Sequence, residues 1–147
     1  MSEGTEAQVL AANRAFYAAF HRRDARAMAA LWAVRAPVAC IHPGWPPLTD
    51  REMVLKSWAD ILRNPASPKI QPRGEQAMIL GPSTAMVILV EVIDDQALAA
   101  TNVFVREDGD WRLVHHQASP LAGTLEAGGP EIEADDEEDT PPSTLLH

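Results

Sequence analysis

Polar side chains able to bind or transfer protons lie within the most β-rich part of the chain. Asn102 and His115 stand on either side of Asp108-Gly109. Asp-Gly is the strongest short-range signal for a two-residue hairpin, because a type I′ turn needs positive φ at both central residues. Strict pairing around that turn places Asn102 opposite His115. Polar groups on an apolar sheet face are costly unless they are hydrogen-bonded or line a cavity, so this face is the candidate site.

The same reasoning extends to the neighbouring strands. Pairing around Asp108-Gly109 also places Ala100 opposite Gln117, and a turn at Asp95-Gln96 places Glu91 opposite Ala100. One sheet face is then expected to carry Val87, Leu89, Glu91, Asn102, Phe104, Leu113, His115 and Gln117, and the other Met86, Ile88, Val90, Val103, Val105 and Val114. A slip of one residue would exchange the two faces.

Glu91 is the first candidate for catalysis, because it stands within the apolar run Val87-Ile88-Leu89-Val90-Glu91-Val92-Ile93. In a closed cavity, burial would raise its pKa and make it a plausible general base for taking a proton next to a carbonyl group. The alternative is a carboxylate at the end of a strand, paired with an arginine or in solvent.

His115 and Asn102 are candidates for binding a substrate oxygen or a water, since a neutral imidazole donates at one nitrogen and accepts at the other. His115 is the second catalytic candidate, and Asn102 and Gln117 are ligand-binding candidates. The alternative is a cross-strand hydrogen bond that satisfies both groups. His116 is expected on the opposite face.

His42 ends a short β-branched run and precedes the rigid loop Pro43-Gly44-Trp45-Pro46-Pro47, which is typical of the mouth of a pocket. Its side chain is expected either to point inward or to bond the backbone. Trp58 is either a core residue or an aromatic pocket wall, the latter suiting a flat apolar ligand. His42, His115 and Glu91 lack the spacing of a metal-binding motif, so no metal or cofactor is expected.

Helix and strand signals follow one another along the chain. A capping box at Thr5-Glu6-Ala7-Gln8, a cap at Asp24 and a second capping box at Thr49-Asp50-Arg51-Glu52 predict three helices, with a short strand at 37–42 before the third. From Ile70 the apolar period changes to two, and Pro72 and Gly74 indicate an edge strand or a bulge. The chain is therefore predicted to be an α+β protein with helices packed on a curved antiparallel sheet.

Composition limits the class of protein. The chain has 147 residues, and a single Cys40 excludes an intrachain disulfide, which favours a reducing, cytoplasmic location. No secretion signal or membrane-spanning run is visible. Residues 121–147 hold eight of the 21 acidic residues and no Lys or Arg, which leaves 13 acidic against 12 basic residues in 1–120. A domain over 1–122 and a disordered acidic tail over 123–147 are expected, and the near-neutral domain argues against nucleic-acid binding.

On these residues the chain resembles the nuclear transport factor 2-like (NTF2-like) superfamily and, within it, the SnoaL-like and ketosteroid-isomerase-like domains. The resemblance covers about residues 5–120. It rests on helix 9–22 and the segment 24–32, on His42-Pro43-Gly44, on the helix with Trp58, and above all on the run from Thr101 to Pro120. It implies a cone-shaped fold, a pocket between helices and concave sheet, and frequent homodimers through the outer sheet face.

The resemblance does not settle a reaction, because this superfamily hosts isomerases, cyclases, dehydratases and non-catalytic binding modules. Many SnoaL-like relatives have a second His where this chain has Gln117, and the Asp of an isomerase base is lacking, with Glu91 the nearest carboxylate. Two functions stay open. One is an isomerase, cyclase or hydratase acting on a small apolar carbonyl compound, and the other is a non-catalytic ligand-binding or dimeric association module. A homodimer is expected from the apolar outer face.

Overall fold

The computed structural model describes residues 2–122 and contains three helices and five strands. The helices are α1 (Ser2–Arg22), α2 (Ala25–Ala30) and α3 (Arg51–Arg63). The strands are β1 (Ala39–Ile41), β2 (Gln71–Gly81), β3 (Thr84–Ile93), β4 (Gln96–Glu107) and β5 (Asp110–Pro120). This order confirms the expected α+β class. The expected acidic tail, residues 123–147, lies outside the described residues.

Two of the helices begin at aspartates that cap them. The Asp24 side chain accepts a hydrogen bond from the Ala27 amide at 3.0 Å, and the Asp50 side chain accepts one from the Met53 amide at 3.1 Å. Each bond satisfies one of the amides that a helix leaves unpaired in its first turn. The cap of α3 is therefore Asp50, one residue beyond the Thr49 that opens the predicted capping box.

The sheet has the strand order β1-β5-β4-β3-β2. Strands β2 to β5 form the expected antiparallel meander, while β1 pairs with β5 in parallel, so the sheet is mixed rather than wholly antiparallel. The parallel pairing follows from α1 and α2, which precede β1 and carry the chain to that edge. Strand β2 is the other edge and is bulged between Arg73 and Gln76, as Pro72 and Gly74 indicated.

The turns decide which residues face one another. Glu107 pairs with Asp110 around Asp108-Gly109, both of which have positive φ (52° and 85°), as a type I′ turn requires. The other turn lies at 94–95 instead of Asp95-Gln96, because Ile93 pairs with Gln96. Glu91 consequently pairs with Leu98 rather than Ala100, a shift of two residues that leaves each side chain on its expected face.

A bulge in the last hairpin overturns the expected register beyond Phe104. Phe104 pairs with Leu113 but Val103 pairs with His115, so Val114 is an extra residue on β5. Asn102 then pairs with His116, not with His115. Because side chains alternate along a strand, one extra residue exchanges the faces of everything that follows it.

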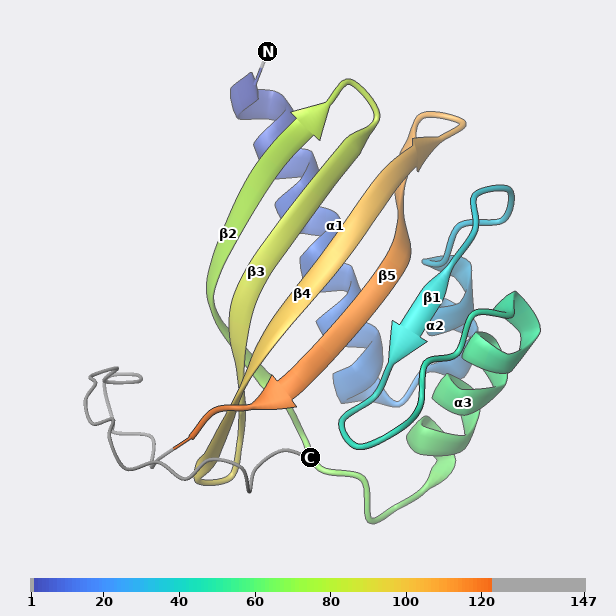
Figure 1. Cartoon of the computed structure of the whole chain (residues 1–147), viewed down its shortest axis with the longest axis vertical. Helices are drawn as coiled ribbons and strands as arrows, with labels where there is room; N and C mark the ends of the chain where they lie inside the picture. Colours follow the sequence, from blue (N-terminus) through green and yellow to red (C-terminus); the bar gives the residue numbers. More distant parts are fainter. Residues whose placement is uncertain (1, 123–147) are drawn as a thin grey trace.

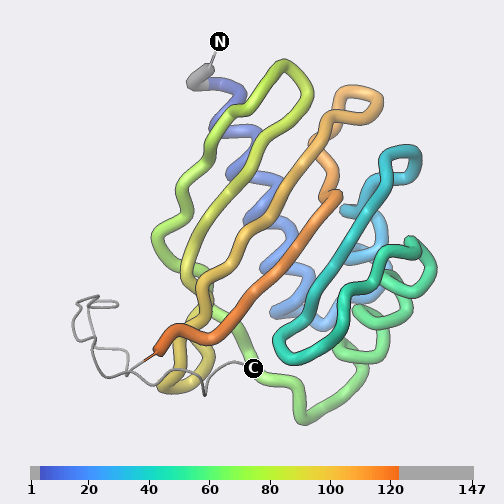
Figure 2. The backbone as a smooth tube through the Cα atoms, in the orientation of Figure 1, coloured from blue at the N-terminus to red at the C-terminus, as the bar shows by residue number. Residues whose placement is uncertain are grey.

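The helices and the sheet enclose one apolar core. Helix α1 runs along one face of the curved sheet, while α2 and α3 lie towards the β1 edge (Figure 1). The chain after β1 folds back beside it, with Cys40 bridged to Leu48, before entering α3 (Figure 2). The largest fully buried side chains include Trp32, Phe16, Phe104, Met28 and Leu113. The inner face of the sheet therefore packs against α1. Any polar residue that is buried between them requires an explanation.

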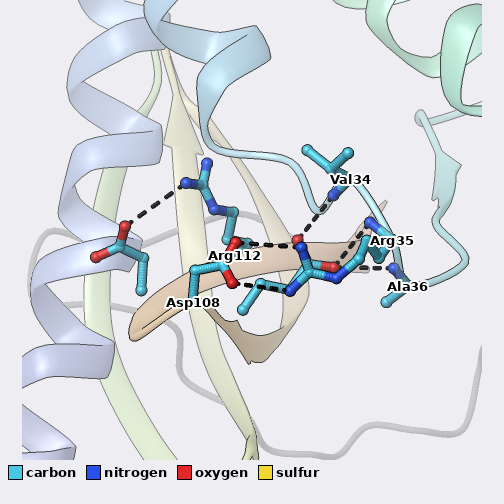
Figure 3. Close-up of polar contacts among 7 residues, drawn as sticks. Val34, Arg35, Ala36, Asp108 and Arg112 are labelled. Atoms are coloured by element: carbon cyan, nitrogen blue, oxygen red, sulfur yellow. Dashed lines mark hydrogen bonds and ion pairs between the residues drawn. The ribbon is translucent and has the colours of Figure 1, made fainter.

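A carboxylate fastens the loop after α2 to the β4–β5 turn. Glu107 accepts hydrogen bonds from the amides of Val34, Arg35 and Ala36, each at 2.9 Å (Figure 3). The Arg35 guanidinium also pairs with Asp108 at 3.1 Å. These backbone bonds hold the pKa of Glu107 below its ordinary value. The contacts belong to the scaffold and lie apart from the inner sheet face.

Candidate active site

Four elements bring five polar side chains together on the inner face of the sheet. We call this set the polar cluster: Asn13 and Tyr17 from α1, Glu91 from β3, Asn102 from β4 and His116 from β5. None of them is more than 3% exposed. Buried charged and polar groups of this kind are uncommon unless they are hydrogen-bonded, so their partners decide what the cluster can do.

Helix α1 supplies its part of the cluster from the same face that packs on the sheet. Val9, Asn13, Phe16, Tyr17 and Phe20 are spaced at three and four residues and are all buried. Residues at such intervals share one helix face. The apolar side chains fix the position of α1 on the sheet, and two polar side chains are thereby carried into the interior.

Tyr17 and Asn102 connect the helix to the strands. The Tyr17 hydroxyl donates to Glu91 Oε2 at 2.7 Å and accepts from Asn102 Nδ2 at 3.2 Å. Asn102 Nδ2 also donates to Asn13 Oδ1 at 2.8 Å, and Asn102 Oδ1 lies 2.6 Å from His116 Nδ1. His116 Nε2 is 3.9 Å from Glu91 Oε2. The cluster is thus a continuous network centred on Glu91 and Asn102.

The electrostatics of the cluster are dominated by burial. Desolvation raises the pKa of Glu91 above its ordinary value, although the hydrogen bond from Tyr17 opposes this. Burial, and then the nearby Glu91 charge, raise the pKa of Tyr17 far above its usual value. Burial lowers the pKa of His116 to about 3, so its imidazole is neutral at pH 7. A buried carboxyl group with a raised pKa beside a neutral imidazole can accept and return a proton.

Aromatic rings line one side of the cluster. His116 has its ring centroid 5.0 Å from Phe16 and 5.6 Å from Trp58. Trp58 in turn contacts His42, at 4.7 Å between ring centroids, and His42 contacts Trp45 at the same distance. Trp45 is 44% exposed, so a row of rings leads from the surface to His116.

His42 itself is buried, with 3% of its surface exposed, and is held by α3. The Ser57 hydroxyl donates to the Val54 carbonyl at 2.7 Å, so its oxygen accepts from His42 Nε2 at 2.8 Å. Burial lowers the pKa of His42 to about 4, which keeps the ring neutral. The inward orientation expected for His42 is therefore what the structure has, and the partner is a side chain rather than the backbone.

Trp58 and Cys40 lie beside this histidine. The Trp58 indole N–H is buried and makes no hydrogen bond within residues 2–122. Burial raises the pKa of the Cys40 thiol to about 12, although Trp58 opposes this. A thiol with so high a pKa is a buried apolar group and not a nucleophile.

The structure brings Glu91, Asn102, Trp58 and His42 to the aromatic and polar interior, but not His115 or Gln117. His115 lies on the other face of β5, where its Nδ1 meets the Ala39 carbonyl of β1 at 3.1 Å, and Gln117 is exposed. The expected placement of both residues was wrong because of the bulge at Val114. His116 occupies the position that had been expected for His115.

Asn13 and Tyr17 were missed from the sequence, although a signal was present. Both fall at helical spacing between the apolar residues Val9, Phe16 and Phe20, and so had to be buried with them. Within residues 2–122 no group of three or more His, Cys, Asp or Glu side chains gathers in a way that could hold a metal ion. No helix in that range is long and apolar enough to cross a membrane.

Two solved structures resemble this chain closely in sequence as well as fold. A candidate dehydratase of the NTF2-like family from Streptomyces avermitilis is 32% identical, with a TM-score of 0.77 over 84% of this chain and 100% of that chain. A candidate calcium/calmodulin-dependent protein kinase type II association domain from Thiobacillus denitrificans is 37% identical, with a TM-score of 0.64 over 76% of this chain and 93% of that chain.

A curated relative is the F-box protein SKIP8 of Arabidopsis thaliana, 26% identical over 118 residues. The match covers 80% of this chain and 51% of that protein, so the chain spans about half the length of the curated relative. The model of the SnoaL-like domain matches residues 9–123, which include every residue of the polar cluster. The chain therefore belongs to the SnoaL-like domain family and has an NTF2-like fold.

Proposed function

We propose that this protein is an acid–base enzyme that moves a proton next to the carbonyl group of a small apolar compound, with Glu91 as the base. The observation that carries the proposal is the state of Glu91, which is 2% exposed, has a raised pKa and receives a hydrogen bond from Tyr17. A desolvated carboxylate is a stronger base than one in water, which suits Glu91 to taking a proton.

The reaction begins when the Glu91 carboxylate takes a proton from the carbon beside the carbonyl. The electron pair of the broken C–H bond passes to the carbonyl oxygen, giving an enolate. Once Glu91 is protonated it no longer requires the hydrogen bond from Tyr17, and the Tyr17 hydroxyl is free to donate to the enolate oxygen. Return of the proton from Glu91 to another carbon completes an isomerisation.

The aromatic neighbours of the cluster support an apolar substrate. Phe16 and Trp58 meet the His116 ring, and the row of rings continues through His42 to the exposed Trp45. Flat apolar ligands are bound by such walls, with a few polar groups fixing their orientation. The name of the Streptomyces avermitilis protein, a candidate dehydratase, is consistent with chemistry of this class.

The second candidate is a non-catalytic binding or association module. It is favoured by the closure of the network, in which Tyr17, Asn102 and Asn13 satisfy one another. The name of the Thiobacillus denitrificans protein, a candidate association domain, points the same way. In this alternative the cluster stabilises the fold and transfers no proton. A cytoplasmic location remains a prediction of the sequence under both functions.

Deuterium exchange separates the two functions. The full-length protein is incubated with 4-phenylbutan-2-one, a flat apolar ketone, in D2O, and loss of the protons next to the carbonyl is followed by NMR. We expect exchange that Glu91→Gln reduces about 10²–10⁴-fold, the usual contribution of a positioned base. The amide keeps the shape of the side chain and accepts from Tyr17, so the midpoint of thermal unfolding should change little.

The matched control is Glu52→Gln, an acidic residue of the same size that is exposed in the first turn of α3, away from the polar cluster. It should retain most of the exchange. Equal rates in the wild type and Glu91→Gln, or no exchange above the protein-free rate, would exclude the enzymatic proposal and leave the binding module.

A further inference from the structure

The hydrogen-bond directions in the cluster follow from one carboxylate. Glu75 has only acceptor oxygens when ionised, so the Asn13 amide nitrogen faces it, at 3.5 Å, and Asn13 Oδ1 faces Asn102. Asn102 therefore presents its nitrogen to Asn13 and to Tyr17, and its oxygen to His116 Nδ1 at 2.6 Å. A carbonyl oxygen cannot donate, so His116 must carry its proton on Nδ1.

The other nitrogen of His116 is consequently an acceptor. A neutral imidazole has one N–H, which is used at Nδ1, so Nε2 carries a lone pair, and this nitrogen lies 3.9 Å from Glu91 Oε2. The Tyr17 proton is already donated to Glu91, so no proton of the described chain lies between the imidazole and the carboxylate. Two buried acceptors that face each other need a donor from elsewhere.

We propose that His116 Nε2 accepts the hydrogen of the hydroxyl group that is lost from or added to the substrate, with Glu91 beside the same oxygen, which makes the substrate a β-hydroxy carbonyl compound or its α,β-unsaturated product. An oxygen atom can lie about 2.8 Å from both acceptors, since they are only 3.9 Å apart. The two contacts then subtend roughly 90° at that oxygen, which suits the two hydrogens of one water molecule.

The chemistry balances with these two side chains alone. In dehydration, the Glu91 carboxylate takes the proton from the carbon beside the carbonyl, and an enolate forms. The enolate collapses to a carbon–carbon double bond as the bond between the β-carbon and the hydroxyl oxygen breaks. The leaving hydroxide takes the proton from Glu91 and departs as water. Hydration is the reverse sequence. Glu91 takes one proton from the attacking water, His116 Nε2 accepts a hydrogen bond from its second hydrogen, and the lone pair of the water oxygen forms the bond to the β-carbon.

Asn102, Asn13 and Glu75 are positioning residues in this account, because they set the tautomer of His116 without touching the substrate. This inference rests on the proposed function for the identity of the base. The inference also requires a hydroxyl group on the substrate, which proton transfer alone does not. Different results can therefore contradict the proposed function and the inference about the hydroxyl group.

Nitrogen NMR of the full-length protein labelled with 15N-histidine tests the inference. We expect His116 to be protonated at Nδ1 and bare at Nε2, and Asn102→Leu to remove that preference. Addition of 4-hydroxy-4-phenylbutan-2-one should shift the Nε2 resonance, and 4-phenylbutan-2-one, which lacks the hydroxyl, should bind about tenfold more weakly or worse. A proton on Nε2, equal binding of the two ketones, or binding of neither would overturn the inference.

A variant pair on β5 supplies the control. His116→Phe should abolish the preference for the hydroxy ketone, while His115→Phe, on the other face, should keep it. Should His116→Phe fail to fold, the tautomer and binding measurements on the wild type still decide. Deuterium exchange into 4-phenylbutan-2-one that depends on Glu91, without preference for the hydroxy ketone, would support the proposed function and contradict the hydroxyl site.

Discussion

Two glutamates show how the surroundings of a single residue set its chemistry. Glu91 is buried with one hydrogen-bond donor, Tyr17, and its pKa is raised because desolvation outweighs that bond. Glu107 accepts three backbone amides, and its pKa is lowered. Desolvation dominates at Glu91 and the backbone donors dominate at Glu107, so the two pKa shifts have opposite directions. The carboxyl group with few donors keeps its basicity for a reaction, and the one with three donors is locked into the scaffold.

His42 should make the protein sensitive to acid. Its folded pKa, about 4, is below the ordinary 6.5, so the unfolded chain binds the proton first. The contribution of neutral, buried His42 to the free energy of unfolding is therefore complete above pH 6.5 and is lost as pH falls towards 4. Between pH 7 and pH 5 the loss is on the order of 2 kcal/mol.

His42→Gln keeps a donor for Ser57 and does not titrate. Its free energy of unfolding, measured by urea denaturation, should therefore fall less steeply over that range than that of the wild type. His116 contributes with the same sign as His42, and Glu91, with its raised pKa, with the opposite sign above pH 4.5. His116 and Glu91 are present in both the wild type and His42→Gln. Parallel curves of unfolding free energy against pH for these two proteins would therefore show that His42 is not kept neutral by burial.

At the scale of elements, the Glu107 contacts join the β4–β5 turn to the loop that follows α2 (Figure 3). Glu107→Gln removes the charge and replaces one of the two accepting oxygens by an NH2 group, which cannot accept, and should lower the free energy of unfolding by about 1.5–3 kcal/mol. Because the folded pKa is lowered, the contribution of Glu107 is complete above its ordinary value of 4.5 and is lost as pH falls below it.

The matched control is Asp108→Asn, at the neighbouring residue of the same turn. Its ion pair with Arg35 is exposed, with 75% and 63% of the side chains accessible, and should matter little for stability. Equal losses in the two variants at neutral pH, measured by thermal unfolding, would mean that the backbone contacts do not fasten the loop.

The same elements show what the sequence can and cannot determine. The type I′ turn at Asp108-Gly109, the Asp24 cap and the edge character of β2 depend on local residues and were predicted correctly. The two capping boxes were not, because α1 begins at Ser2, before Thr5, and the cap of α3 is Asp50 instead of Thr49. The bulge at Val114 has no local signal, since a valine suits a regular strand equally well. The bulge places His116 instead of His115 on the inner face of the sheet. The burial of Asn13 and Tyr17, in contrast, is predictable, because they lie at helical spacing among the apolar residues of α1.

At the scale of the whole molecule, the outer face of the sheet is apolar but only half-buried, which the contacts within one chain do not explain. Met86, Ile88, Val90, Val103, Val105 and Val114 are all only half-buried. The bulge leaves the first five on the face that was expected. A continuous apolar sheet face of this kind is typical of a surface that packs on another chain, and an isologous homodimer is the simplest such assembly.

We therefore predict a particle of twice 16.0 kDa by light scattering at micromolar concentration. Ile88→Glu should shift it to the monomer mass, because an uncompensated charge at the centre of an apolar interface is costly. Met53→Glu is the control, since Met53 is 53% exposed on α3, away from the sheet face. A 16 kDa wild-type particle would rule out the dimer.

The pH dependence of ketone exchange tests the central claim, that Glu91 is the base, most directly. The kcat/KM for deuterium exchange into 4-phenylbutan-2-one reports the pKa of the essential base in the free enzyme. We predict a rate that rises with pH and levels off above an apparent pKa higher than the 4.5 of an ordinary glutamate, with this dependence absent in Glu91→Gln. An apparent pKa of 4.5 or lower, or the same profile in both proteins, would contradict the account.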